Sequence, residues 1–293
     1  MKWNGVVKNI LCSISPKLAT QVMYLFNFKK PLNLKKPQNI NEKLQYLKLN
    51  TYYENPVITQ CADKYSVREY LDKKGYAYLL PKLLGGYLCA EDIRKDWSGF
   101  PNQFVVKCNH GCGYNILVTN KEETDLNQVL KQLNTWMRED FWKIYCEPQY
   151  KDIKRHIIVE EFLGEDIQTY KFYCFNGRPR VLYISANGEN GEKDLYLDYY
   201  DMKWNWLPIS LEGHEHAKLK ANRPKHFDKM VVLAEELSSD FPFVRVDLYN
   251  VDGVIYFSEL TFIPTGGNMK LKPESVLEEW GRWLQLGCGN SCH

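Results

Sequence analysis

The chain of 293 residues contains no run of about 18 to 20 apolar residues, the length that a membrane-crossing helix requires. It also has little net charge, because 38 Lys and Arg stand against 36 Asp and Glu, which leaves +2. Nucleic-acid-binding domains normally carry a pronounced basic excess, so nucleic acid is not an expected partner. The nine cysteines follow no fixed spacing, which favours reduced thiols and a cytoplasmic location over the disulfides of a secreted protein.

Several signatures of common enzyme classes are missing as well. The sequence has no His-Glu-x-x-His, no Gly-x-Ser-x-Gly and no Walker A loop closed by Gly-Lys-Ser/Thr. It has no Asp-x-Asp, the usual metal and nucleotide-sugar signature of glycosyl transfer. Zincin proteases, α/β-hydrolases and P-loop enzymes are therefore not expected.

Acidic residues are absent from the first 41 positions, which hold seven Lys and no Arg. Apolar residues such as Val6, Ile10 and Leu25 are interleaved with these lysines, a composition typical of a helix at a membrane surface. We therefore expect residues 1–38 to form a basic helical segment and linker that can touch an anionic membrane at its inner face. Packing of the same apolar residues on the protein body is the alternative.

The remaining pattern mixes helices with strands that are joined by hairpins, which predicts an α+β fold. Pro31 and Pro37 indicate an extended linker and a boundary near residue 38. Asn176-Gly177 and Asp252-Gly253 are the turn signals of two hairpins. Expected helices cover 40–49, 62–74, 125–144, 226–238 and 274–286; expected strands cover 104–108, 115–118, 157–163, 170–175, 178–185, 243–249 and 254–262.

Four chemically active residues lie on the two arms of the last expected hairpin. Arg245 and Asp247 are two apart on the first arm, and Glu259 and Thr261 are two apart on the second. Because side chains alternate along a strand, each pair shares one face of its own strand. If the two faces coincide, the carboxylates repel each other unless a cation lies between them, and Mg²⁺ takes such hard oxygen ligands. An ordinary surface ion pair is the alternative.

Two upstream segments carry groups that suit a nucleotide. The strand ending at Lys107 runs into a loop with Gly111 and Gly113, whose backbone N–H groups can approach phosphate together with the lysine. The apolar strand that starts near residue 157 leads out at Glu160 and Leu163, where a carboxylate and backbone groups can meet an adenine edge. A strand end with solvated acids is the alternative for the second segment.

Taken in order, several motifs resemble the TupA-like branch of the ATP-grasp superfamily over roughly residues 38–286. The motifs are Asn41-Glu42-Lys43-Leu44-Gln45, Asp63-Lys64-Tyr65, Val106-Lys107-Cys108-Asn109-His110-Gly111, Tyr170-Lys171-Phe172, Phe175-Asn176-Gly177 and Val244-Arg245-Val246-Asp247-Leu248-Tyr249. The resemblance implies an ATP-grasp fold with two α+β lobes that grip ATP. We accordingly expect a pre-grasp region at 39–100, a small lobe at 101–163 and a large lobe with the Mg-binding hairpin at 164–293.

The resemblance also implies roles for the matching residues. Those expected to bind ATP are the phosphate-binding lysines Lys64 and Lys107, the phosphate loop with His110, Gly111, Gly113 and Asn115, the adenine-binding Glu160 and Leu163, and Asp166 near the ribose. Asp247 and Glu259 correspond to ligands of two Mg²⁺ ions, while Arg245 and Lys171 correspond to groups facing the acyl phosphate. The family usually has Asn where Thr261 stands, and a hydroxyl coordinates Mg²⁺ with a shorter reach.

The activity that the resemblance implies is ATP-dependent ligation of a carboxylate to an amine through an acyl phosphate. The expected carboxylate is a uronic acid of a capsular or other surface polysaccharide or its nucleotide-sugar precursor, and the amine is an amino acid or a small amine. Glycosyl transfer and phosphorylation of a sugar hydroxyl are the alternative activities. A zinc module built on Cys108, His110 and Cys112 is a further alternative, although it lacks the fourth ligand of a structural zinc site.

Overall fold

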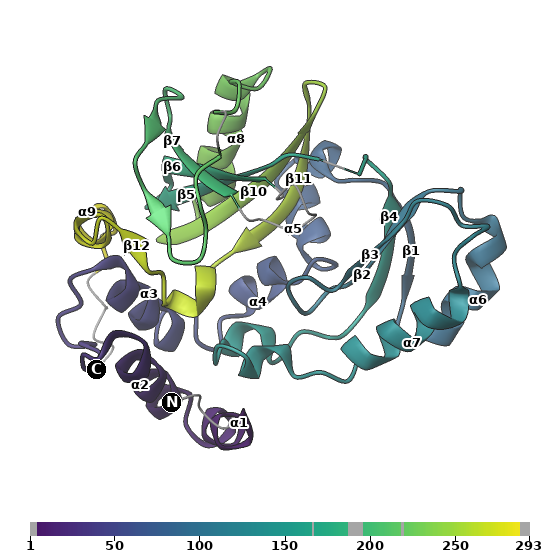
Figure 1. The fold of residues 1–293 in the computed structure, drawn as a ribbon. Helices are drawn as coiled ribbons and strands as arrows, with labels where there is room; N and C mark the ends of the chain where they lie inside the picture. The colour runs from purple at the N-terminus through teal and green to yellow at the C-terminus, as the bar shows by residue number, and fades with distance from the viewer. Residues whose placement is uncertain (1–4, 166, 187–195, 218–219, 288–293) are drawn as a thin grey trace. The chain divides into compact units, whose positions relative to one another are not determined.

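The computed structural model describes residues 5–165, 167–186, 196–217 and 220–287. The chain forms two compact units, of which the first combines residues 1–53 with 168–293 and the second spans residues 54–167. Each unit contains helices and its own antiparallel sheet, as the ribbon in Figure 1 shows. The α+β class predicted from the sequence is therefore confirmed.

The elements follow one another in an irregular order of helices and hairpins (Figure 1). The helices within the described residues are α1 (Gly5–Ile14), α2 (Pro16–Phe28), α3 (Ile40–Leu49), α4 (Pro56–Ala62), α5 (Val67–Lys73), α6 (Ile93–Asp96), α7 (Leu126–Trp136), α8 (Phe227–Ser238) and α9 (Ser275–Trp283). The strands are β1 (Leu83–Tyr87), β2 (Phe104–Cys108), β3 (Asn115–Val118), β4 (Ile157–Glu161), β5 (Thr169–Phe175), β6 (Arg178–Ala186), β7 (Tyr196–Asp201), β8 (Trp206–Leu207), β9 (Ser210–Leu211), β10 (Phe243–Val251), β11 (Val254–Thr261) and β12 (Leu271–Lys272).

The first unit is built on a six-stranded sheet with the order β11-β10-β5-β6-β7-β8. Helix α8 packs on one face of this sheet, where Phe172 and Phe227 have ring centroids 6.1 Å apart. Val246 on the same face is buried. The opposite face carries the polar residues of the predicted magnesium hairpin, and Trp280 of α9 packs there on Tyr173 at 4.8 Å. The sheet thus packs under α8 with one face, and its other face carries the polar hairpin residues beside the contact with α9.

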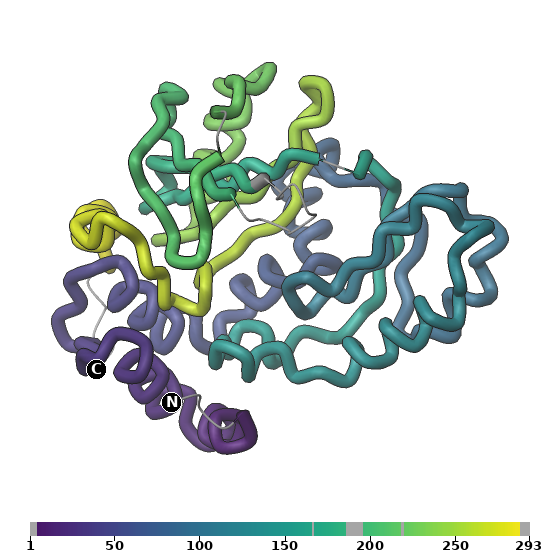
Figure 2. Tube along the Cα trace, viewed as in Figure 1, coloured from purple at the N-terminus to yellow at the C-terminus, as the bar shows by residue number. Residues whose placement is uncertain are grey.

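Two tight hairpins connect four neighbouring strands of this sheet, β11, β10, β5 and β6 (Figure 2). Asn176 and Gly177 connect β5 to β6 with φ values of 48° and 75°, and Asp252 and Gly253 connect β10 to β11 with 52° and 96°. Two consecutive positive φ angles define the turn whose twist matches that of antiparallel strands, and Asn, Asp and Gly tolerate them best. Both hairpins were predicted from these dipeptides, and both are confirmed.

Helix α3 joins the N-terminal segment to the C-terminal part of the first unit. The Asn39 side chain accepts a hydrogen bond from the Glu42 N–H at 3.0 Å, and Glu42 accepts one from the Gln38 N–H at 2.7 Å. Buried Asn41 exchanges two hydrogen bonds with the backbone of Met269, at 2.7 and 2.9 Å. Residues 39–53 therefore lie in the unit that holds the C-terminus, while the four-part division made from the sequence stays a prediction.

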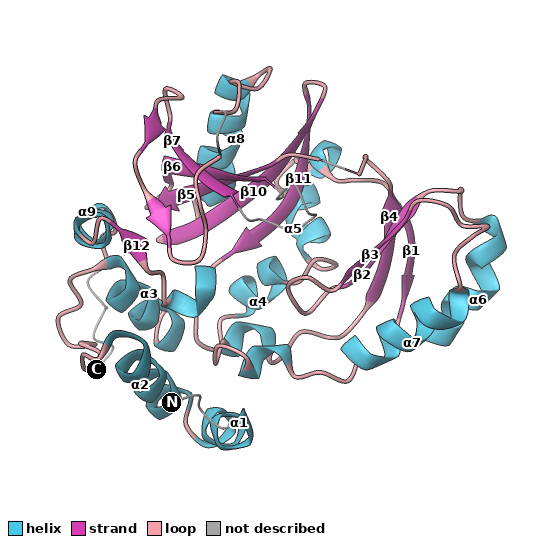
Figure 3. Cartoon of the chain, viewed as in Figure 1, coloured by secondary structure: helices cyan, strands magenta, loops and turns pink. Residues whose placement is uncertain are grey.

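The second unit has a four-stranded sheet with the order β1-β4-β2-β3, and helices α6 and α7 cover one of its faces (Figure 3). Ile93 of α6 and Leu133 of α7 are buried in one core with Val106 and Val159 of the sheet. Strands 104–108 and 115–118 have the bounds that the sequence predicted. The other face of the sheet carries Lys107, which is therefore directed away from this core.

Three predicted helices are shorter than expected, and the one predicted over 274–286 ends at Trp283. The helix predicted to start at 62 begins only at Val67, because the Asp63 carboxylate accepts hydrogen bonds from the Tyr65 N–H at 2.8 Å and the Ser66 hydroxyl at 2.6 Å and so stabilises a turn. The helix predicted to reach 144 ends at Trp136, and Arg155 donates to the next carbonyl, that of Met137, at 2.7 Å.

The N-terminal segment is helical as predicted, and α1 and α2 are in contact with each other. Among the helices that the structure describes, none combines the length and the apolar character needed to cross a bilayer.

We predict that Gly281→Ala destabilises the protein by about 1 to 2 kcal/mol, although alanine normally stabilises a helix interior relative to glycine. The added Cβ would lie 2.8 Å from Asn39 Cα and would overlap the Gln38 carbonyl oxygen, so the backbone beneath α9 would have to move. Urea denaturation of the two proteins measures the change. Gly99→Ala is the control, because a Cβ there meets no atom within 4 Å. Equal midpoints for Gly281→Ala and wild type would contradict this account of the packing.

Candidate functional site

A one-residue bulge brings the four residues of the predicted magnesium hairpin onto one face of the sheet. Near the turn, β10 and β11 pair in a regular register, with Leu248 opposite Phe257. The register then shifts, so that Asp247 lies opposite Glu259 rather than Ser258, and Arg245 lies opposite Thr261. Directly opposed residues point to the same face, so the bulge decides that the two carboxylates meet.

A second bulge acts in the same way in the neighbouring hairpin. Phe175 pairs with Arg178 at the turn, but after a shift between Tyr173 and Cys174 the strand partner of Lys171 is Tyr183. Lys171 is also the partner of Asp247 across β5 and β10. Glu259, Asp247, Lys171 and Tyr183 therefore form one continuous row across four strands.

The guanidinium of Arg245 binds the other three residues of the predicted magnesium site, Asp247, Glu259 and Thr261. Its Nε and one terminal nitrogen donate to the two oxygens of Asp247 at 2.7 and 2.6 Å. The same terminal nitrogen donates to Thr261 Oγ1 at 2.9 Å and to Glu259 Oε1 at 3.3 Å. Its other terminal nitrogen lies 3.4 Å from the Tyr183 hydroxyl. The surface ion pair considered as an alternative is thus a buried network, since Arg245 is 9% exposed and Asp247 2%.

Burial and pairing shift the pKa values of these groups in opposite directions. Burial raises the pKa of the Asp247 carboxyl, and the Arg245 cation counteracts this rise. Burial by itself lowers the pKa of Arg245, but Asp247 together with Tyr183 and Tyr173 outweighs it and leaves the pKa well above its ordinary value. For Lys171, burial is likewise outweighed, by Tyr183 and then by Asp247 and Glu259, so its pKa is raised. Arg245 and Lys171 are therefore two cations held beside two acids.

The donor set fits the Mg²⁺ expected from the sequence. Oxygens of Asp247, Glu259 and Thr261 all lie between 2.6 and 3.3 Å from one nitrogen of Arg245, so they surround a position that a cation already occupies. One or two carboxylates plus other oxygens are what Mg²⁺ normally takes from a protein. Across the described ranges no group of three or more His, Cys, Asp and Glu side chains could hold a metal ion, so this site depends on two carboxylates and a hydroxyl.

In the second unit, Lys107 and Glu160 meet on the sheet face opposite the core. Lys107 Nζ lies 2.7 Å from one oxygen of Glu160, and the guanidinium of Arg68 lies 2.9 Å from the other. The side chains of Lys107 and Arg68 are 18% and 17% exposed, and that of Glu160 is 7% exposed. Glu160 is thus a largely buried acid between two cations rather than a solvated strand end, which replaces the alternative considered for this segment.

Lys64 stands in the turn before α5 and points to the glycine loop. Its Nζ donates to the Gly111 carbonyl at 2.7 Å. The fully buried Asn109 holds the two segments together, because its amide donates to Asp63 at 2.6 Å and its carbonyl oxygen accepts from the His156 N–H at 2.7 Å. The structure therefore brings Lys64 beside the loop that follows Lys107, as the predicted phosphate site requires.

The four predicted loop residues have different surroundings. His110 is buried, its Nε2 lies 3.1 Å from the Trp136 carbonyl, and burial lowers its pKa, so its ring belongs to the core. A Cβ on Gly111 would lie 2.6 Å from the Tyr114 ring, whereas Gly113 has a φ of 75° and open space around it. Asn115 is exposed at the start of β3, opposite Lys107. The backbone of the loop, with Gly113 and Asn115, is what remains accessible.

Two further predicted residues lie after β4. Leu163 is half-buried just beyond the end of the strand at Glu161, and Asp166 lies outside the described residues. The zinc alternative is not favoured, because Cys108 is buried and His110 bonds to a carbonyl while Cys112 is exposed. Burial raises the pKa of the Cys108 thiol to about 12, which disfavours the thiolate that zinc binding needs.

Three residues at these sites had no role in the sequence analysis: Arg68, Asn109 and Tyr183. Arg68 lies in a short helix without a distinctive pattern, and its contact with Glu160 joins positions 92 residues apart. Tyr183 meets Lys171 only because of the register shift in β5–β6. Asn109 is part of a quoted motif, and its position two residues after Lys107 was the one available signal.

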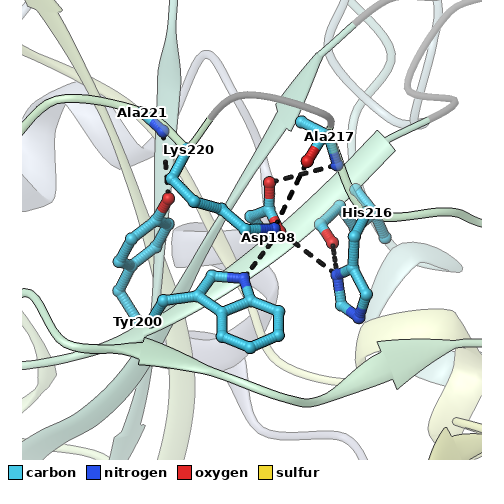
Figure 4. A network of polar contacts seen from close by, with 8 residues as sticks. Asp198, Tyr200, His216, Ala217, Lys220 and Ala221 are labelled. Atoms are coloured by element: carbon cyan, nitrogen blue, oxygen red, sulfur yellow. Dashed lines mark hydrogen bonds and ion pairs between the residues drawn. The ribbon is translucent and has the colours of Figure 1, made fainter.

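A separate polar network fixes the end of the first unit's sheet (Figure 4). Buried Asp198 of β7 accepts hydrogen bonds from Lys220 Nζ and Trp206 Nε1, each at 2.8 Å, and lies 3.1 Å from His216 Nδ1. Lys220 covers the Trp206 ring at 4.3 Å, so that face of the ring is not free to stack on a sugar. The network attaches the segment after β9 to the sheet.

Comparison with known proteins identifies the family. A family model described as TupA-like ATPgrasp matches residues 42–284. No curated protein matches the sequence significantly. Among solved structures, an L-amino acid ligase from Bacillus licheniformis is similar, with 15% identity over 86% of this chain and 56% of that chain and a TM-score of 0.47.

Two D-alanine–D-alanine ligases are similar at the same distant level. The enzyme from Helicobacter pylori has 15% identity over 85% of this chain and 71% of that chain, with a TM-score of 0.43. The enzyme from Bacillus anthracis has 18% identity over 69% of this chain and 57% of that chain, with a TM-score of 0.39. This chain thus spans little more than half the length of the latter. The match over residues 42–284 covers most of the sequence, and the chain therefore belongs to the TupA-like ATP-grasp family, as its motifs predicted.

Proposed function

We propose that this chain is an ADP-forming carbon–nitrogen ligase, which activates a substrate carboxylate with MgATP and joins it to an amine. The observation that carries the proposal is the convergence of Asp247, Glu259 and Thr261 oxygens on the position now held by one nitrogen of Arg245, with Lys171 paired to Asp247 on the next strand. Phosphoryl transfer to a carboxylate gathers negative charge, so catalysis depends on such fixed charges.

In the proposed site, Asp247, Glu259 and Thr261 would hold Mg²⁺, which supplies charge neutralisation for the ATP phosphates when bound. Arg245 would face the acyl phosphate and stabilise the oxyanion that forms when the amine attacks, and Lys171 would hold the transferred phosphate or the acyl group. Both residues stand on central strands of a six-stranded sheet, so their backbone positions are fixed before substrate arrives. We assign no covalent nucleophile.

The second unit contains the other residues that we expect to bind ATP. Lys64 and Lys107 would bind phosphates, and the backbone N–H groups of the loop around Gly113 would cover them. Glu160 and Leu163 would meet the adenine, and Asp166 the ribose. Supporting this assignment, Lys64 is hydrogen-bonded to the loop and Lys107 is held by Glu160, so both cations lie on ordered structure.

The substrate class follows from the family resemblance. We propose a uronic-acid carboxylate of a capsular or other surface polysaccharide, or of its nucleotide-sugar precursor, and an amino acid or small amine as the second substrate. Glycosyl transfer and sugar phosphorylation are outcomes that the substrate experiment below separates from ligation.

The N-terminal segment supports a location in the cytoplasm at the inner face of the membrane. Val6, Ile10 and Ile14 follow one another at four-residue spacing on α1, and their side chains are 65%, 55% and 76% exposed. Apolar residues at this spacing share one helix face. Lys17 and Lys29 nearby are exposed, and the first 41 positions contain no acidic residue. This excess of positive charge suits an anionic lipid surface.

We predict that Glu259→Gln lowers ATP turnover by about a hundredfold or more, because it removes one charged metal ligand from the site. Phosphate release measures turnover, and circular dichroism checks that the fold is kept. Asp252→Asn is the control, since it removes a carboxylate from the exposed turn of the same hairpin, where Asn tolerates the positive φ of 52°. Turnover of Glu259→Gln near the wild-type rate would show that the metal assignment is wrong.

We predict that ADP and phosphate form only when a uronate and an amine are both present, with an amide as the product. The assay uses free and nucleotide-linked uronates, each with and without a panel of amines, and mass spectrometry of the products. A phosphorylated sugar made without any amine would instead identify a kinase. Release of a nucleoside diphosphate from a sugar donor would identify a glycosyltransferase.

We predict that the protein cosediments with vesicles containing anionic lipid at low salt and less so at high salt, because screening weakens the attraction of the lysines. Ile14→Glu should reduce binding, since it places a charge on the apolar face of α1. Val232→Glu is the matched control: it adds the same charge at a helix position that is 51% exposed on α8. Absence of cosedimentation at low salt would dismiss the membrane contact.

A further inference from the structure

We propose that Arg245 is an internal counter-ion that competes with the metal, so that a divalent cation and ATP bind in a mutually dependent way. This inference rests on the proposed function, because it takes Asp247, Glu259 and Thr261 as the metal ligands. It adds a regulatory step to that site: the guanidinium must leave the ligand oxygens before a metal ion can use them.

Geometry makes the two arrangements mutually exclusive. One terminal nitrogen of Arg245 lies 2.6 Å from Asp247 Oδ2, 2.9 Å from Thr261 Oγ1 and 3.3 Å from Glu259 Oε1. A magnesium ion that bound the same oxygens at its usual distance of about 2 Å would overlap this nitrogen. A second hydrogen bond of the same guanidinium, from Nε to Asp247 Oδ1 at 2.7 Å, engages the other oxygen of that carboxylate. Arg245 therefore holds Asp247 by a fork of two hydrogen bonds.

Charge balance opposes a metal ion on its own. The polar cluster contains two cations, Arg245 and Lys171, and two carboxylates, Asp247 and Glu259, so these charges cancel. Adding a divalent cation alone would leave an excess positive charge in a largely buried cluster, which is costly. The phosphates of ATP restore the balance, because they bring negative charge for the metal and for the displaced guanidinium. Metal affinity should therefore be low without nucleotide and should rise with it.

Tyr183 offers the guanidinium a second contact when the carboxylates are taken. Its hydroxyl already lies 3.4 Å from a terminal nitrogen of Arg245, and its ring centroid is 5.8 Å from the guanidinium carbon. The same ring lies 5.3 Å from Lys171 Nζ. An aromatic face at this range stabilises a cation. Tyr183 is thus a positioning residue that keeps Arg245 close to the reacting groups after the fork opens.

The consequence is an ordered assembly of the site. Nucleotide and metal favour each other because both are needed to displace the guanidinium from the carboxylates. Arg245 becomes free to face an acyl phosphate only when the nucleotide that forms it is bound.

The test is a titration of the full chain with Mn²⁺, followed by the electron paramagnetic resonance of the free ion, without and with a non-hydrolysable ATP analogue. We expect Arg245→Met to bind Mn²⁺ about tenfold more tightly than wild type without nucleotide, and to gain less affinity from the analogue. Lys171→Met is the matched control, because Lys171 neighbours Asp247 across the strands but forms no hydrogen bond with it or with Glu259 among the described residues. It should gain no more than about threefold, from the loss of one nearby charge.

Equal gains for Arg245→Met and Lys171→Met would overturn the competition, because they would reflect overall charge alone. Unchanged Mn²⁺ affinity in Arg245→Met would also overturn the proposed competition. If thermal denaturation shows that Arg245→Met does not fold, Arg245→Lys is titrated in its place, because it keeps the charge but loses the two-bond fork. A gain in Mn²⁺ affinity over wild type that is smaller than tenfold supports the proposal, and no gain contradicts it. Glu259→Gln in the Arg245→Met protein tests the site itself, since Mn²⁺ binding that survives it would refute the proposed metal ligands.

Discussion

The register of two hairpins is the constraint on which the active face of this protein depends. The tight turn at Asp252-Gly253 alone would pair Asp247 with Ser258 and direct Glu259 to the apolar face beneath α8. A single extra residue in β11 moves Glu259 opposite Asp247. Because side-chain direction alternates along a strand, this shift of one residue changes which face every later side chain occupies. The β5–β6 hairpin does the same for Tyr183.

The charged side chains that these register shifts bring together contribute little to the stability of the fold. Arg245 and Asp247 are almost fully buried, and the desolvation of a buried ion pair commonly consumes what the attraction contributes. Stability of the first unit comes instead from the opposite face, where Phe172 and Val246 pack under α8. The sheet separates the two tasks by alternation, so a charged cluster can be held rigidly without interrupting the core.

Both units hold their cations in the same manner. Lys107 and Arg68 share the Glu160 carboxylate, much as Arg245 is held by Asp247, with Glu259 as a further acceptor. In each case a carboxylate balances positive charge that would otherwise be buried unpaired and keeps the cation in a defined position. Asn109 fixes the backbone nearby, because its side chain links the turn that contains Lys64 to the start of the strand that contains Glu160. An enzyme that binds a triphosphate needs such prearranged cations.

The sequence by itself determined the family, the α+β class and both hairpin turns, because dipeptides such as Asn176-Gly177 and short motifs act through local backbone conformation. The helices predicted over 62–74 and 125–144 are shorter in the structure. Asp63 and Arg155 form hydrogen bonds with the turns at these places, and the hydrophobic periodicity of the sequence does not reveal such contacts. Only the tertiary structure decided that Glu259 faces Asp247, that Tyr183 faces Lys171 and that Arg68 reaches Glu160. Bulges and contacts between distant segments depend on how strands pack, which no local pattern encodes.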